Sequence, residues 1–169
     1  MNYTQVRFMM ESGDTVACKV RKWGSIIIRI FTAESTNHIA MIFVAEDGGV
    51  WIYEMLEGKG LVITPASQWF AEQHARGVET TYCRAPKTVK PELAKEFLLS
   101  LRAEDPSYGY WSLIKVWFSQ VFNKMVRTRQ YVCSTAAQRM HEYAGYTGYT
   151  RLADPGDIVS HATGTIPVR

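Results

Sequence analysis

The sequence has few cysteines and no long hydrophobic segment. Its three cysteines, Cys18, Cys83 and Cys133, are odd in number and far apart, which argues against a disulfide framework. The longest apolar segment, residues 111–125, is interrupted by two lysines and two side-chain amides. We therefore expect no transmembrane segment, because a bilayer-spanning helix needs about 20 predominantly apolar residues.

The N-terminal residues do not resemble a secretory signal, and no stretch of the sequence is strongly basic. Residues 1–14 contain charged side chains and no apolar run, so they do not resemble a signal peptide. The net charge is only +3, without the clustered lysines and arginines of a nucleic-acid footprint, so we expect no nucleic-acid partner. By default we expect a cytoplasmic protein, in a reducing compartment that leaves a thiol available.

What is present is the composition of one globular domain. The 169 residues are 47% hydrophobic and 21% charged, with no repeat or linker, so we treat 1–169 as a single domain. Periodicity and turn residues predict strands over 15–20, 37–45, 50–55, 61–64 and 80–84, and helices over 65–75, 91–104, 111–125 and 134–145.

Two segments are harder to interpret. In residues 23–33 the β-branched run favours a strand, but Ser25 could cap a short helix with an apolar face. The tail, with Asp154-Pro-Gly-Asp157 and Pro167, is expected to be mostly turn. Strands in the first half and helices in the second predict an α+β fold.

Cys133 is the first candidate for chemistry. It lies where a short extended segment becomes a helix-forming run, and we expect Ser134 to cap that helix. The unsatisfied N–H groups at a helix start favour the thiolate and can bind a developing oxyanion. The alternative is a buried cysteine that only packs, because free cysteine is among the most buried residue types.

His38 is the candidate base. Of the four histidines, His74 lies on a polar helix end, His141 is too far along the Cys133 helix, and His161 is in the tail. His38 instead begins an apolar strand and has a side chain whose ordinary pKa is near neutrality. The alternative is a strand-edge histidine that a backbone carbonyl satisfies.

The next strand carries a carboxylate that could orient this base. Alternation places Val50, Ile52 and Glu54 on one face, and a carboxylate there is costly unless it is paired. A hairpin turn centred near residue 46 places Glu54 opposite His38, whereas a later turn places Glu57 there. Alternatively, Glu54 reaches solvent at the end of the strand.

The remaining candidates are weaker. Tyr108, Tyr110 and Tyr131 are assigned to a substrate groove, although Tyr108 and Tyr110 could also pack at a helix entry. We expect no metal and no other cofactor, because the sequence has no Cys-x-x-Cys or His-Glu-x-x-His motif.

The order of these motifs resembles the circularly permuted branch of the NlpC-type papain-like peptidase superfamily. His38 precedes Cys133, as that branch requires, whereas ordinary members place cysteine first. The resemblance rests on Ser12-Gly-Asp14, Asn37-His-Ile-Ala40, Ile52-Tyr-Glu54, Tyr108-Gly-Tyr110, Tyr131-Val-Cys-Ser134 and Ala153-Asp-Pro-Gly-Asp-Ile158. It favours Glu54 over Glu57 and implies a helix over Ser25–Thr32.

The chain departs from the family pattern in two places. It has Cys-Ser-Thr-Ala where many permuted members have Cys-Ser-Glu-Leu, and Ala40 and Met41 replace more typical strand residues. The resemblance implies a permuted papain-like fold and a thiol hydrolase, an amidase or peptidase, with Cys133, His38 and Glu54 as its triad. Members of this kind occur in bacteria and phages.

Other functions fit the same residues. A lipid-directed acyltransferase or lipase would use the same triad on an acyl ester. A non-catalytic binding module would not need the thiol, and a structural protein would present the aromatic helix to a partner. The expected substrate is therefore a peptide, another amide or an acyl ester.

Overall fold

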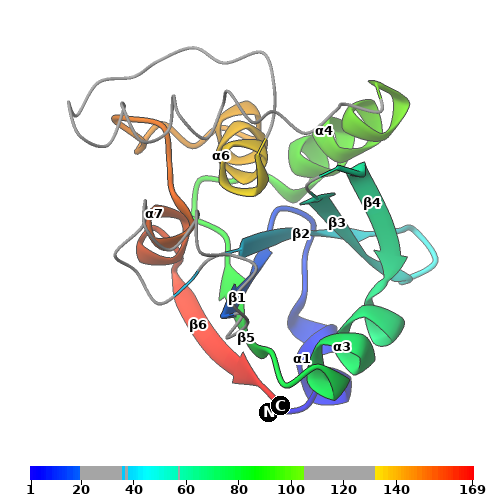
Figure 1. Cartoon of the computed structure of the whole chain (residues 1–169). Coiled ribbons are helices and arrows are strands. Elements are labelled where there is room, and N and C mark those ends of the chain that lie inside the picture. Colours follow the sequence, from blue (N-terminus) through cyan, green and yellow to red (C-terminus); the bar gives the residue numbers. More distant parts are fainter. Residues whose placement is uncertain (20–35, 37, 57, 105–131) are drawn as a thin grey trace.

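The fold is an antiparallel sheet with helices on both faces (Figure 1). The computed structural model describes residues 1–19, 36, 38–56, 58–104 and 132–169. The predicted helices over 25–32 and 111–125 therefore lie outside the described residues, as do Tyr108, Tyr110, Tyr131 and Glu57.

The described chain forms six strands, five helices and one 3-10 turn. The strands are β1 Thr15–Lys19, β2 His38–Val44, β3 Val50–Leu56, β4 Gly60–Pro65, β5 Glu79–Arg84 and β6 Gly164–Val168. The helices are α1 Tyr3–Val6, α3 Ala66–Ala75, α4 Pro91–Glu104, α6 Cys133–Tyr143 and α7 Pro155–Ser160, and the turn η1 is Arg7–Met9. The five predicted strands and the helices near 65–75, 91–104 and 134–145 are confirmed to within about two residues.

The six strands have the order β4-β3-β2-β1-β5-β6, and each strand is antiparallel to its neighbours. Alternation along the strands makes two apolar faces. Ile39, Met41 and Tyr53 belong to the core beneath α4, α6 and α7, whereas Ala40 and Ile52 belong to the core beneath α1 and α3. The predicted α+β class is therefore observed as three layers.

The expectation that the tail is mostly turn is wrong. Asp154 caps α7: its Oδ1 accepts the Asp157 N–H at 2.8 Å, and Asp157 Oδ2 accepts the Asp154 N–H at 3.1 Å. Pro155 follows at the first helical position, where a missing N–H costs nothing. Beyond α7, β6 pairs with β5, and Pro167 is tolerated because an edge strand needs fewer ladder donors.

A glycine is required where the chain enters β1. Gly13 has φ +103°, and a Cβ at this position would lie 2.9 Å from Val89 Cγ1 and 3.0 Å from Ala94 Cβ. The Gly13 carbonyl accepts a hydrogen bond from His141 Nε2 at 2.9 Å, so this turn connects β1 to α6. Both the backbone conformation and the close packing favour glycine.

Gly13→Ala should lower the free energy of unfolding by about 2 kcal/mol or more, because backbone strain and overpacking act together. Gly58→Ala is the matched control: Gly58 has φ +73°, but a Cβ at this position would meet nothing within 4 Å. It should cost only about 1 kcal/mol, from backbone strain alone. Urea denaturation measures both, and equal losses would contradict the packing role of Gly13.

Candidate functional site

Cys133 is the first residue of α6, and Val132 before it is extended, with φ −113° and ψ 168°. The predicted cap at Ser134 is wrong, because the N-cap position is occupied by Val132. A valine side chain has no hydrogen-bond acceptor, so it takes none of the N–H groups that a helix leaves unsatisfied in its first turn. The Cys133 side chain therefore lies among backbone donors, with only 8% of the residue exposed.

His38 and Glu54 form a hydrogen-bonded ion pair on the sheet. His38 Nε2 lies 2.9 Å from Glu54 Oε1, and the two side chains are 19% and 8% exposed. The β2–β3 register pairs Met41 with Tyr53 and Ile42 with Ile52. Continuing it places Glu54 opposite Ala40, so Glu54 reaches His38 diagonally and not from the directly opposite position expected from the sequence.

The diagonal contact depends on a small residue at position 40. Ala40 is fully buried and follows His38 by two residues, so both side chains lie on the same side of β2. A methyl group there leaves room for the Glu54 side chain to turn toward the imidazole. The other neighbour of β2 in the sheet is β1, and its Cys18 pairs directly with His38.

The Cys133 and His38 side chains are close enough for each to shift the pKa of the other. Since Nε2 of His38 contacts Glu54, Nδ1 is the ring nitrogen left for the thiol. The backbone groups of Ile39 and Ser134 also act on the Cys133 thiol and lower its pKa. The structure thus brings together Cys133, His38 and Glu54, which come from a helix and two different strands.

The electrostatics of the three groups favour charge separation. Burial acts to raise the pKa of Cys133, but hydrogen bonds and charge from His38, with the two backbone donors, outweigh it and lower that pKa. Burial acts to lower the pKa of His38, but Cys133 and Glu54 outweigh it and raise that pKa. The arrangement therefore stabilises a thiolate beside an imidazolium.

The other two cysteines behave differently. Burial raises the pKa of Cys18 well above its ordinary value, and it raises the pKa of Cys83 to about 11. They are 2% and 1% exposed, in β1 and β5 respectively. Neither pKa is lowered by a neighbouring histidine, as that of Cys133 is, so the three thiols should differ in reactivity.

A buried histidine fixes the last turn of α6. His141 Nε2 lies 2.9 Å from the Gly13 carbonyl oxygen, which can only accept, so this nitrogen carries the proton. Nδ1 must then accept from the Tyr149 hydroxyl, at 2.8 Å. Burial lowers the pKa of His141 to about 4, which is consistent with a neutral ring that has a structural role.

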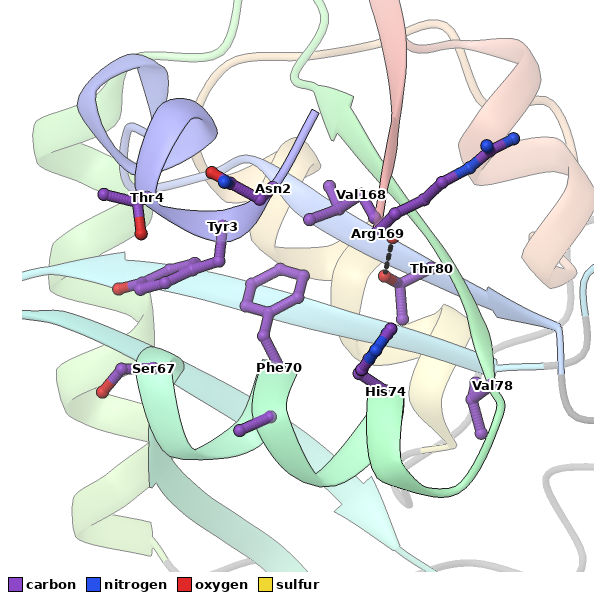
Figure 2. A pocket seen from close by; sticks show the side chains of 11 residues that line it. Asn2, Tyr3, Thr4, Ser67, Phe70, His74, Val78, Thr80, Val168 and Arg169 are labelled. Atoms are coloured by element: carbon purple, nitrogen blue, oxygen red, sulfur yellow. Dashed lines mark hydrogen bonds between the residues drawn. The ribbon is translucent and has the colours of Figure 1, made fainter.

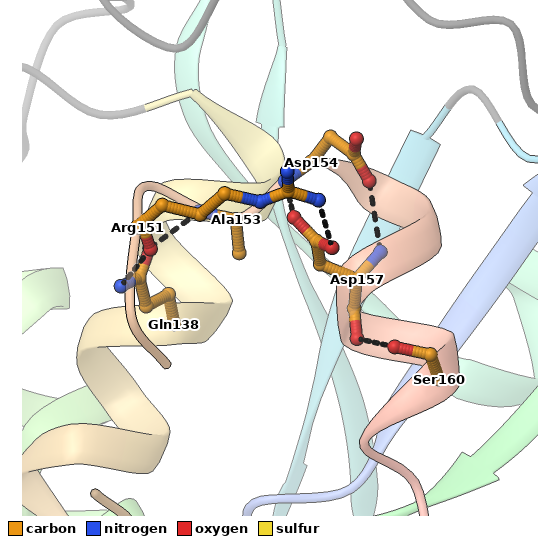
Figure 3. A network of polar contacts seen from close by, with 6 residues as sticks. All are labelled: Gln138, Arg151, Ala153, Asp154, Asp157 and Ser160. Carbon is orange, nitrogen blue, oxygen red and sulfur yellow. Dashed lines mark hydrogen bonds and ion pairs between the residues drawn. The ribbon is translucent and has the colours of Figure 1, made fainter. Parts of the chain in front are cut away.

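A buried glutamine attaches the segment after α6 to the helix (Figure 3). Gln138 Oε1 accepts the Ala153 N–H at 2.7 Å, and Gln138 Nε2 donates to the Arg151 carbonyl at 3.0 Å. Arg151 in turn pairs with Asp157 at 2.9 Å. These contacts hold α7 against α6 and help to set the position of the α6 start relative to β2.

A separate pocket lies between α1, α3 and the end of β6 (Figure 2). It has a volume of about 290 Å³ and is lined by Phe70 and His74 of α3, among others; Tyr3 and Phe70 stack on it with ring centroids 5.1 Å apart. None of Cys133, His38 and Glu54 lines this pocket. It is therefore distinct from the candidate site.

The described residues contain no group of three or more His, Cys, Asp and Glu side chains arranged to hold a metal ion. None of the helices in the described ranges combines the length and apolar character needed to cross a membrane.

The sequence interpretation missed Thr135, whose hydroxyl contacts the Val132 backbone. A capping box normally has its hydroxyl at the N-cap and is recognised by that residue. Here the N-cap is apolar, so the pattern gave no signal. The sequence marked Ala40 only as a departure from the family pattern. Its position opposite Glu54 could not be predicted without the β2–β3 register.

No protein-family model and no curated protein matches this sequence. Among solved structures, the chain is similar to the crystal structure of the metalloprotein yiiX from Escherichia coli O157:H7, DUF1105, with a TM-score of 0.55 and 15% sequence identity. The similarity covers 80% of this chain and 66% of yiiX, so this chain spans just under two thirds of that protein. At this identity the likeness concerns the fold.

Proposed function

We propose that this protein is a thiol hydrolase, an amidase or peptidase, on a circularly permuted papain-like fold. The observation that carries the proposal is the convergence of Cys133, His38 and Glu54, which come from α6, β2 and β3: His38 is hydrogen-bonded to Glu54 and interacts with the Cys133 thiol. A nucleophile, a base in contact with it and a group that orients the base are the parts that covalent catalysis requires. The order histidine, glutamate, cysteine also agrees with the permuted branch.

In the first half of the reaction, the Cys133 thiolate attacks the carbonyl carbon of an amide. The carbonyl oxygen becomes an oxyanion. The Ser134 backbone already interacts with the sulfur, so the Cys133 N–H at the start of α6 is the donor left for this oxyanion. His38 gives its proton to the leaving nitrogen as the C–N bond breaks. The amine departs, and an acyl thioester remains on Cys133.

In the second half, His38 accepts a proton from water, whose oxygen attacks the thioester. The C–S bond breaks, the acid product leaves, and the thiolate–imidazolium pair is restored. Glu54 holds Nε2 of His38 throughout, so Nδ1 stays directed at the sulfur and the imidazolium is stabilised. The same steps would cleave an acyl ester, and an assay therefore has to include both bond types.

The thiolate should be detectable before any substrate is known. In wild-type protein near pH 7, iodoacetamide should label Cys133 far faster than Cys18 or Cys83, because only the pKa of Cys133 is lowered. His38→Ala should shift the labelling profile to higher pH. The variant loses the His38 interaction that lowers the pKa of Cys133, whereas burial still raises that pKa. The measurement is the labelling rate against pH, resolved by peptide mass spectrometry.

His74→Ala is the control for this profile, because His74 is exposed on α3 and remote from the thiol. It should leave the labelling profile of Cys133 unchanged. Equal labelling of all three cysteines in the wild type would refute the activated thiolate.

Turnover should depend on the whole triad. On a panel of peptide amides and acyl esters, Cys133→Ala should reduce hydrolysis to background, and Glu54→Gln should lower kcat/KM by at least about 10²-fold. Acid-quenched intact mass should reveal an acyl adduct on Cys133 with the preferred substrate. Peptide-amide substrates are expected to be turned over in preference to acyl esters.

Cys83→Ala is the matched control, since Cys83 is a buried thiol in β5 outside the triad. It should retain wild-type turnover. Preference for acyl esters would replace the amidase proposal by an acyltransferase or lipase, and turnover that persists in Cys133→Ala would end the proposal of covalent catalysis.

A further inference from the structure

The N-cap residue of α6 has no polar side chain, and a residue inside the helix binds the N-cap backbone instead. Most helices begin with Ser, Thr, Asp or Asn at the N-cap, whose side chain accepts an N–H of the first turn. In α6 the N-cap is Val132, and the hydroxyl is three residues later, on Thr135. Thr135 Oγ1 accepts the Val132 N–H at 3.0 Å and donates to the Val132 carbonyl at 3.2 Å.

This arrangement satisfies a buried backbone group without using the helix donors. Val132 and Thr135 are each 1% exposed, so the Val132 N–H has no water to bind and would be costly to leave unpaired. Thr135 supplies its acceptor. The Val132 carbonyl also accepts the Ala136 N–H at 3.0 Å, which is the first main-chain hydrogen bond of α6.

The consequence concerns the donors around the sulfur. An N-cap hydroxyl or carboxylate would take the N–H of the second or third helical residue, here Ser134 or Thr135. In this chain the Ser134 backbone instead contacts the Cys133 sulfur. A side-chain oxygen at position 132 would compete for that donor and bring a lone pair or a negative charge close to the thiolate.

We propose that Thr135 is a positioning residue for the nucleophile: by holding the apolar N-cap Val132 from within the helix, it leaves the first N–H groups of α6 to the Cys133 thiolate and to a developing oxyanion. The role rests on the proposed function of Cys133 as nucleophile.

Two nearly isosteric exchanges test the two halves of this arrangement. Thr135→Val removes the hydroxyl, and Val132→Thr adds one at the N-cap. Both should shift the pH profile of Cys133 labelling by iodoacetamide upward by about half a unit to one unit, because each weakens the donors at the sulfur. Thr135→Ser keeps the hydroxyl and should retain the wild-type profile.

Hydrogen exchange separates positioning from general destabilisation. In Thr135→Val the Val132 amide should exchange at least about tenfold faster, whereas amides in the last turn of α6 should keep their protection. If Thr135→Val does not fold, Val132→Thr still tests the competition for donors. The proposal is overturned if the labelling profile is unchanged in folded Thr135→Val or Val132→Thr. It is also overturned if Thr135→Ser does not retain the wild-type profile.

The labelling readout does not require a substrate, so the two proposals can fail separately. A shifted profile in a protein that hydrolyses nothing on the panel supports the role of Thr135 at the thiol and counts against the hydrolase. Wild-type turnover with an unshifted profile in Thr135→Val counts against Thr135 alone.

Discussion

The pairing of Glu54 with His38 is the constraint on which the arrangement of the site depends. A carboxylate inside an apolar strand must find a partner, because an isolated buried charge is too costly. In this sheet the partner is a histidine on the next strand, 2.9 Å away, and the contact is possible because Ala40 occupies little space. Once Nε2 is held there, Nδ1 is directed to the helix start, where Cys133 lies.

The two halves of the site come from different layers. The sheet supplies His38 and Glu54, and α6 supplies Cys133 with its backbone donors. Gly13, His141 and Gln138 determine where α6 lies, through contacts with the approach to β1 and with the segment before α7. These are ordinary packing and hydrogen-bonding residues, yet they help to set the position of Cys133 relative to His38.

Much of this could be predicted from the sequence, because the relevant signals are local. A continuous apolar run in 37–45 and alternation in 50–55, with turn residues between them, predicted the hairpin, and the carboxylate in an apolar strand predicted a partner for His38. The diagonal contact could not be predicted, because register depends on the turn geometry, and the expected direct opposition was wrong. The tail was misjudged because Asp154-Pro-Gly-Asp157 fits both a turn and a capped helix.

The separation of the site between layers has a consequence for folding. His38 and Glu54 can meet as soon as the hairpin forms, but Cys133 reaches them only after a helix from the other end of the chain docks on the sheet. Contacts of this sequence separation form late, since their loop-closure entropy must be offset by packing. The nascent chain therefore carries a chemically ordinary thiol, and the contacts that lower the pKa of Cys133 form only with native tertiary structure.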